Sequence, residues 1–151
     1  MIKICIVEDE KSQADLLTNY IRKYDSNPDA FSIEWLEDGM DLVDDYKGQY
    51  DIIFLDIQMK HLDGMAAAEK IRKVDSDVII IFITSTVQYA VQGYAVDALG
   101  YVLKPVPYEA FRQLLDKTEN YKSHYNKCCN CNINSSSHNV LLFLVLIALI
   151  N

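Results

Sequence analysis

Five short apolar runs recur along the chain, separated by longer stretches in which apolar and polar residues mix. Three of the runs are nearly continuous in Ile, Val, Leu or Phe, which is typical of strands covered on both faces of a parallel sheet. The second run alternates apolar and polar residues instead, and we interpret it as an edge strand with one wetter face. The five predicted strands are Ile2–Val7, Phe31–Leu36, Ile52–Leu55, Val78–Ile83 and Tyr101–Leu103.

The stretches between these runs carry apolar residues three or four positions apart, which is the spacing of a helix with one buried face. Alternation of strands and helices predicts an α/β fold with a doubly wound parallel sheet. In such a sheet, functional groups collect at the carboxyl ends of the strands. The apolar positions at helical spacing are Ala14, Leu17, Tyr20 and Ile21, then Met40, Val43 and Tyr46, then Met65, Ala68 and Ile71, and finally Phe111, Leu114 and Leu115.

Polar residues follow four of the five predicted strands directly. A single Asp after a strand is usually a turn residue or a helix cap. An acidic pair, an Asp, a Thr and a Lys on successive strand ends favour a shared site instead. These residues are Glu8 and Asp9 after the first strand, Asp56 after the third, Thr84 after the fourth and Lys104 after the fifth.

This set of side chains suits phosphoryl chemistry. Clustered carboxylates repel one another, and a hard cation such as Mg²⁺ relieves that repulsion through oxygen ligands. Asp56 is then a candidate nucleophile toward a phosphoryl group, since carboxylates form aspartyl phosphates. Lys104 and the metal would neutralise charge on the transferring group, and Thr84 would donate a hydrogen bond to it. We expect Lys104 in a solvent-facing cleft without a partner, where it contributes little to stability.

The charge balance narrows the possible partners. The chain has 22 acidic and 14 basic residues and a formal net charge of −8. Direct DNA binding by this chain is therefore not expected, because the phosphate backbone needs clustered Lys and Arg. The N-terminal apolar run is broken early by acidic residues, unlike a secretory signal, so we expect a cytoplasmic protein.

Four segments resemble the response regulator receiver domain of two-component systems. The resemblance covers roughly residues 1–122 and implies a flavodoxin-like (βα)₅ fold with strand order 2-1-3-4-5. It also implies a switch, and not a classical enzyme, that phosphorylates itself from a sensor histidine kinase and slowly dephosphorylates itself. The segments are Ile6–Glu10 (IVEDE), Phe54–Met59 (FLDIQM), Ile83–Ser85 (ITS) and Tyr101–Pro105 (YVLKP).

The resemblance assigns a role to each site residue. Asp56 is the implied phosphoacceptor, Thr84 and Lys104 contact the phosphoryl group, and Thr84 and Tyr101 act as the switch. The Lys104–Pro105 peptide is expected to be cis. Phosphorylation is expected to change the face made by the family's fourth helix, fifth strand and fifth helix, and to promote a homodimer. The implied ligands of Mg²⁺ or Mn²⁺ are Glu8, Asp9, Asp56 and the backbone carbonyl of Gln58.

Residues 90–105 and the LDIQM segment further resemble the receivers of LytTR-type transcription regulators, which implies control of transcription through an effector domain. Two positions depart from the family pattern. The family usually places Pro soon after the residue equivalent to Met59, and this chain has Lys60-His61-Leu62 there. That leaves open the shape of the loop before Gly64. Ser85 also replaces a commoner Ala.

Two other functions would use the same strand-end residues. A phosphohydrolase of the haloacid-dehalogenase type also uses Asp, Thr, Lys and Mg²⁺, but it needs Asp-x-Asp at the nucleophile, and here the motif is Asp56-Ile57-Gln58. A stand-alone receiver that acts through protein–protein contacts is the other alternative. A plain binding domain would leave the residues at the strand ends unexplained.

Residues 123–151 differ in character from the rest of the chain. Asn, Cys and Ser dominate first, and then Val140–Ile150 is uninterrupted and apolar. As a helix this run spans only ~16 Å of a ~30 Å hydrocarbon core, so we expect no membrane span. Metal binding by its Cys and His residues is disfavoured by their spacing. We interpret the segment as a non-domain tail, possibly a frameshifted or truncated effector region, that would drive association if exposed.

Overall fold

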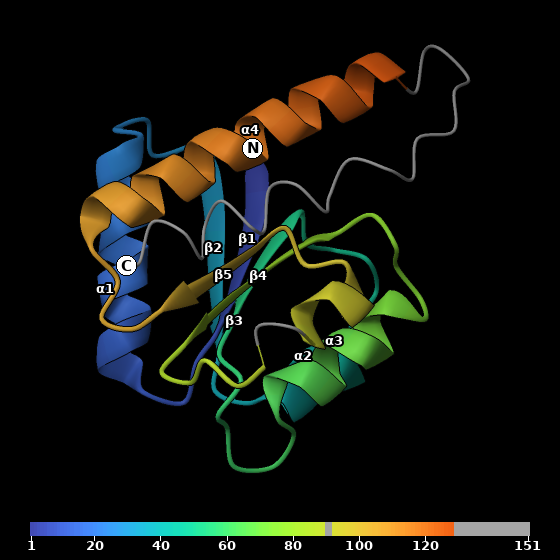
Figure 1. Cartoon of the computed structure of the whole chain (residues 1–151). Coiled ribbons are helices and arrows are strands. Elements are labelled where there is room, and N and C mark those ends of the chain that lie inside the picture. The colour runs from blue at the N-terminus through green and yellow to red at the C-terminus, as the bar shows by residue number, and fades with distance from the viewer. Residues whose placement is uncertain (90–91, 129–151) are drawn as a thin grey trace. The chain divides into compact units, whose positions relative to one another are not determined.

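The five predicted strands form one parallel sheet in the order β2-β1-β3-β4-β5 (Figure 1). The computed structural model describes residues 1–89 and 92–128. The strand order confirms the predicted doubly wound, flavodoxin-like fold. The strands are β1 (Ile2–Val7), β2 (Phe31–Leu36), β3 (Ile52–Leu55), β4 (Ile79–Thr84) and β5 (Gly100–Leu103).

Three α-helices cover the two faces of this sheet within the first 106 residues. The helix α1 (Lys11–Tyr24) lies on one face, and α2 (Gly39–Asp44) and α3 (Gly64–Arg72) lie together on the other (Figure 1). The stretch between β4 and β5 contains the 3₁₀ helix η1 (Gln92–Val96) where the family has its fourth helix. Gly93 inside η1 weakens a longer helix at this point.

A second unit begins at Pro107 and contains the helix α4 (Tyr108–Cys128). Its residues Phe111, Leu114 and Leu115 are buried, as their helical spacing predicted. The helix extends beyond residue 122, where we placed the end of the receiver domain. The Asn-, Cys- and Ser-rich segment beyond Cys128 and the apolar run that ends the chain lie outside the described residues. No helix among residues 1–89 and 92–128 is both long and apolar enough to cross a membrane.

The core lies around the central strands. All side chains of β3 and β4 are buried, as expected for strands covered on both faces. The strand β2 alternates between partly buried and exposed residues, which agrees with its position at the edge of the sheet. Each fully buried Ile, Leu or Phe contributes about 1.5–3 kcal/mol, so the apolar strands supply much of the stability.

Strand register brings the predicted site residues to one edge of the sheet. Val7 at the end of β1 pairs with Leu55 at the end of β3, so the residues that follow them emerge side by side. The Asp56 amide continues this pairing by donating to the Val7 carbonyl over 2.9 Å. At the other side of the site, the Lys104 amide donates to the Thr84 carbonyl over 2.9 Å. The Lys104–Pro105 peptide is cis, as the resemblance implied.

Candidate functional site

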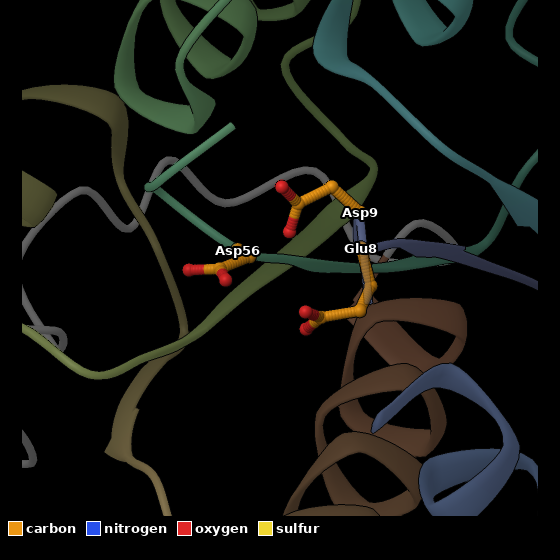
Figure 2. A group of neighbouring side chains, drawn as sticks. All are labelled: Glu8, Asp9 and Asp56. Atoms are coloured by element: carbon orange, nitrogen blue, oxygen red, sulfur yellow. The ribbon is translucent and has the colours of Figure 1, made fainter. Parts of the chain in front are cut away.

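Three carboxylates gather where β1 and β3 end (Figure 2). Glu8, Asp9 and Asp56 each offer an oxygen atom, and these oxygens lie within 4.8 Å of one another. Glu8 and Asp56 are only 1% and 5% exposed, whereas Asp9 is partly buried. An all-oxygen donor set of this kind is what Mg²⁺ prefers in proteins, so the residues fit such an ion.

Lys104 lies between two of these carboxylates. Its Nζ atom is 2.7 Å from Asp56 Oδ2 and 2.7 Å from Glu8 Oε2, and its side chain is only 13% exposed. The expectation that Lys104 has no partner is therefore wrong, although Lys104 does line a cleft, as expected. The side chain is long enough to reach from β5 across the end of β4. Two buried carboxylates without a cation would also be strongly unfavourable.

The pKa values of Glu8 and Lys104 are both raised, but for different reasons. Burial raises the pKa of Glu8, although the hydrogen bond and charge of Lys104 oppose the shift. Burial alone would lower the pKa of Lys104, but the hydrogen bonds and charges of Asp56 and Glu8 outweigh it and raise that pKa. Lys104 is therefore an ammonium ion at neutral pH. One ammonium among three carboxyl groups leaves room for a further cation.

The Asp56 carboxylate is held in one orientation. Its Oδ1 atom accepts hydrogen bonds from the Ile57 amide over 2.6 Å and from the Gln58 amide over 3.2 Å, while Oδ2 faces Lys104. A cleft of about 500 Å³ reaches this carboxylate, and its walls also include Ser85. Asp56 is thus oriented from within the protein and reached from the cleft, as a nucleophile requires.

Thr84 carries a polar atom without a partner. As the last residue of β4 its side chain is 0% exposed, and its Oγ1 atom makes no hydrogen bond within the described part of the chain. Leaving a buried hydroxyl unpaired costs about 1–3 kcal/mol. Such an atom points to a group that would satisfy it, and a phosphoryl oxygen on the neighbouring Asp56 strand end is a suitable acceptor.

Tyr101 is turned toward the interior in this structure. Its ring is 8% exposed and lies beside Phe82, with 6.1 Å between the ring centroids. Its hydroxyl donates to the Thr86 carbonyl, in the segment that follows β4. Burial, with contributions from Asp56 and Tyr89, raises the pKa of Tyr101 to about 12. The tyrosine therefore links β5 to the segment after Thr84 as a neutral hydrogen-bond donor.

Sequence reasoning missed two residues that support the site. The indole N–H of Trp35 donates to the Glu8 carbonyl over 2.8 Å, which fixes the backbone at the end of β1. A side chain on Gly64 would overlap the backbone carbonyl of Asp56, so only glycine allows α3 to begin there. The Asp63-Gly64 pair gave a usable signal for a close approach of this kind, whereas Trp35 looked like an ordinary edge-strand residue.

Residues 4–116 match the family described as the response regulator receiver domain. The chain is 33% identical over 122 residues to the sensory transduction protein LytT of Bacillus anthracis, covering 81% of this chain and 49% of LytT. It is 29% identical over 138 residues to the transcriptional regulatory protein LytR of Staphylococcus aureus, covering 91% of this chain and 55% of LytR. The chain thus spans about half the length of these curated relatives.

Solved structures show the same likeness. The response regulatory domain of mrkE from Klebsiella pneumoniae superposes with a TM-score of 0.72 at 29% identity, covering 82% of this chain and 99% of that domain. The response regulator TrrA from Thermotoga maritima, solved in complex with Mg²⁺ and BeF, gives a TM-score of 0.68 at 27% identity, covering 78% and 99%.

Proposed function

The chain belongs to the response regulator receiver domain family, and from this we propose that it is the phosphorylation switch of a two-component system, accepting a phosphoryl group on Asp56 from a sensor histidine kinase. One observation carries the proposal. Asp56 is an oriented carboxylate with Lys104 at 2.7 Å and with two further carboxylates close by. The proposed nucleophile, the Lys104 ammonium and candidate ligands for a metal ion therefore line a single cleft.

The proposed reaction needs little more than these groups. An Asp56 carboxylate oxygen forms a bond to phosphorus, the phosphorus–nitrogen bond of the donor phosphohistidine breaks, and the imidazole leaves with the electron pair. Lys104 neutralises charge on the phosphoryl oxygens, and the Thr84 hydroxyl donates to one of them. Mg²⁺ or Mn²⁺ bound by Glu8, Asp9, Asp56 and the Gln58 carbonyl would supply further neutralising charge.

The proposed output is a change in the segments that follow the site. Recruitment of the Thr84 hydroxyl would shift the segment that Tyr101 holds through the Thr86 carbonyl. The surface that includes η1 and β5 would then bind a different partner, such as a second receiver. The likeness to LytT and LytR supports transcription control through an effector domain as the final step, while the net charge of −8 argues against DNA binding by this chain itself. We also propose a cytoplasmic location, because the chain belongs to the response regulator receiver domain family.

A haloacid-dehalogenase-like hydrolase fits less well. Its nucleophile needs a second carboxylate two residues later, and Gln58 occupies that position. The amide of Gln58 instead helps to orient Asp56. The residue at position 58 therefore fits a receiver domain better than a hydrolase of this type.

The test is chemical phosphorylation of the full chain. We expect incubation with acetyl phosphate and Mg²⁺ to add one phosphoryl mass to the intact protein, and EDTA to prevent it. Asp56→Asn should gain none, because the amide is not a nucleophile, whereas Asp75→Asn should behave like the wild type. An equal mass gain in Asp56→Asn would show that the phosphorylation site is elsewhere. A gain unaffected by EDTA would show that the reaction needs no metal ion.

A further inference from the structure

Asp38 is a buried carboxylate outside the acidic cluster of Glu8, Asp9 and Asp56. It bonds both to the start of α2 and to the loop before α3. It is 6% exposed and precedes α2, where its Oδ1 atom accepts from the Met40 amide over 2.9 Å as an ordinary helix cap. The same oxygen also accepts from the Leu62 amide over 3.0 Å, and Oδ2 accepts from the His61 amide over 3.0 Å. Helix capping alone does not explain these two bonds to a loop 23 and 24 residues away.

Asp38 is built to stay charged in this position. Burial alone would raise its pKa, but the hydrogen bonds from the Met40, His61 and Leu62 amides outweigh burial and lower it. The ring nitrogen Nδ1 of His61 also lies 3.2 Å from Oδ2. Charge-assisted hydrogen bonds of this kind are about twice as strong as neutral ones. Asp38 is thus a firm anchor for the loop.

The anchored loop begins at the proposed phosphoacceptor. Its first two amides, from Ile57 and Gln58, bond to Asp56 Oδ1, and its last two bonded amides reach Asp38. Only Met59 and Lys60 lie between these two anchors. The Gln58 carbonyl, a proposed metal ligand, therefore belongs to a short span that is fixed at both ends.

Gly39 shows independently how closely α2 approaches this loop. A Cβ atom on Gly39 would lie 2.5 Å from the Leu62 carbonyl oxygen and 3.3 Å from the terminal methyl of Met59. Any larger residue would push the loop away from Asp38. The Asp38-Gly39 pair therefore forms one fitted contact, with a charge to hold the loop and no side chain to obstruct it.

We propose that Asp38 is a positioning residue for metal-dependent phosphoryl acceptance at Asp56, acting through the loop that carries Gln58. This inference rests on the function proposed above. The usual Pro of the family is absent from Lys60-His61-Leu62, so the backbone here has more freedom to lose on folding. Asp38 supplies the order through hydrogen bonds instead. Residues that orient metal ligands in this way typically change metal affinity 10–100-fold when they are replaced.

The chain offers a matched control at the other end of the sheet. Asp75 also accepts two backbone amides, from Asp77 over 2.8 Å and Val78 over 2.9 Å, and it accepts the Tyr46 hydroxyl over 2.7 Å. It precedes β4 and so lies at the amino end of that strand, away from the site. Asp75→Ala therefore removes a comparable set of hydrogen bonds without touching the loop after Asp56.

The experiment measures the phosphoryl gain from acetyl phosphate by intact mass over a range of Mg²⁺ concentrations, with a thermal melt for each variant. We expect Asp38→Ala to raise the Mg²⁺ concentration for half-maximal rate about 10-fold. We expect Asp38→Ala and Asp75→Ala both to lower the melting temperature, but Asp75→Ala should keep the half-maximal Mg²⁺ concentration of the wild type. Asp38→Asn, which keeps one acceptor oxygen, should lie between Asp38→Ala and the wild type.

Equal Mg²⁺ dependence in Asp38→Ala and Asp75→Ala would overturn the inference while leaving the proposed function intact. If Asp38→Ala does not fold, the comparison of Asp38→Asn with Asp75→Asn decides in the same way. A wild-type chain that gains no phosphoryl group would overturn the proposed function and this inference together.

Discussion

Glu8 and Asp56 at the carboxyl ends of the strands are satisfied differently from the carboxylates at the amino ends. At the amino ends of the strands, Asp75 accepts three hydrogen bonds, and Asp51 accepts the Lys3 amide over 2.7 Å. At the carboxyl ends, Glu8 and Asp56 share the single ammonium of Lys104. The first arrangement satisfies each charge locally, whereas the second gathers charge and satisfies it only in part.

The pKa shifts of Asp75 and Glu8 show the same contrast, whereas Asp38, which follows β2, is held by amides and has a lowered pKa like Asp75. Burial alone would raise the pKa of Asp75, but the hydrogen bonds from Tyr46 and from the Val78 and Asp77 amides outweigh it and lower that pKa. The pKa of Glu8 is raised, chiefly by burial. The unpaired hydroxyl of Thr84 adds to the contrast. Asp75 is thus held for stability, whereas Glu8, Asp56 and Thr84 retain unmet interactions that the proposed cation and phosphoryl group would satisfy.

The largest effect should come from Lys104→Ala, which removes the ammonium that Glu8 and Asp56 share. Loss of one partner from a buried ion pair typically costs 3–5 kcal/mol, and we expect about 3 kcal/mol from urea unfolding at pH 7 without Mg²⁺. Added Mg²⁺ should restore part of this loss by binding the folded state. Asp75→Ala should also destabilise the protein, but Mg²⁺ should stabilise it only as much as the wild type, so its deficit relative to the wild type should not change.

The pH dependence of the Lys104→Ala effect has a definite sign. Because the folded protein raises the pKa of Lys104, the stabilisation by this residue is present below the ordinary lysine pKa and is lost as pH rises through the raised value. The difference between the variant and the wild type should also narrow in acid as Glu8 takes up its proton. A difference that does not vary with pH would show that Lys104 acts through packing alone.

Gly64→Ala should have the next largest effect, because its Cβ would overlap the Asp56 carbonyl. Forced overpacking costs about 1–3 kcal/mol, and the resulting backbone shift should also slow phosphoryl gain. Gly48→Ala is the control, since Gly48 has a φ of +70° and only the Asp75 carboxylate nearby at 3.7 Å. It should lose about 1–2 kcal/mol from backbone strain alone. Unchanged phosphorylation in Gly64→Ala would separate this glycine from the site.

The smallest effect should come from Thr84→Val, and it should have the opposite sign. Removal of a buried hydroxyl without a partner should stabilise the unphosphorylated protein by up to about 1 kcal/mol. Thr118→Val, in which the lost hydroxyl bonds to the Leu115 carbonyl over 2.8 Å, should destabilise it instead. Hydrogen exchange of η1 and β5 should respond to acetyl phosphate in the wild type and not in Thr84→Val. If Thr84→Val keeps the change in hydrogen exchange, Thr84 has no role in the switch.

The sequence was informative about the sheet because buried parallel strands must be apolar, and their bounds were predicted to within one residue. The strand-end residues could be found for the same reason, since Asp56 and Glu8 follow paired strand ends. The partners of Lys104 could not be predicted, because they depend on how far its side chain reaches across β4. The contacts of Asp38 join positions distant in the sequence, and nothing local to Asp38 indicates them.

Trp35 should make the fluorescence of the protein sensitive to changes at the acidic cluster. It is the only tryptophan in the chain, and its indole bonds directly to the backbone of Glu8 while the Lys11 ammonium lies 4.3 Å from its ring centroid. Indole emission depends on nearby charge and hydrogen bonding. The protein therefore carries its own fluorophore beside the proposed metal ligands, and cation binding or phosphorylation can be followed in unlabelled protein by its light emission.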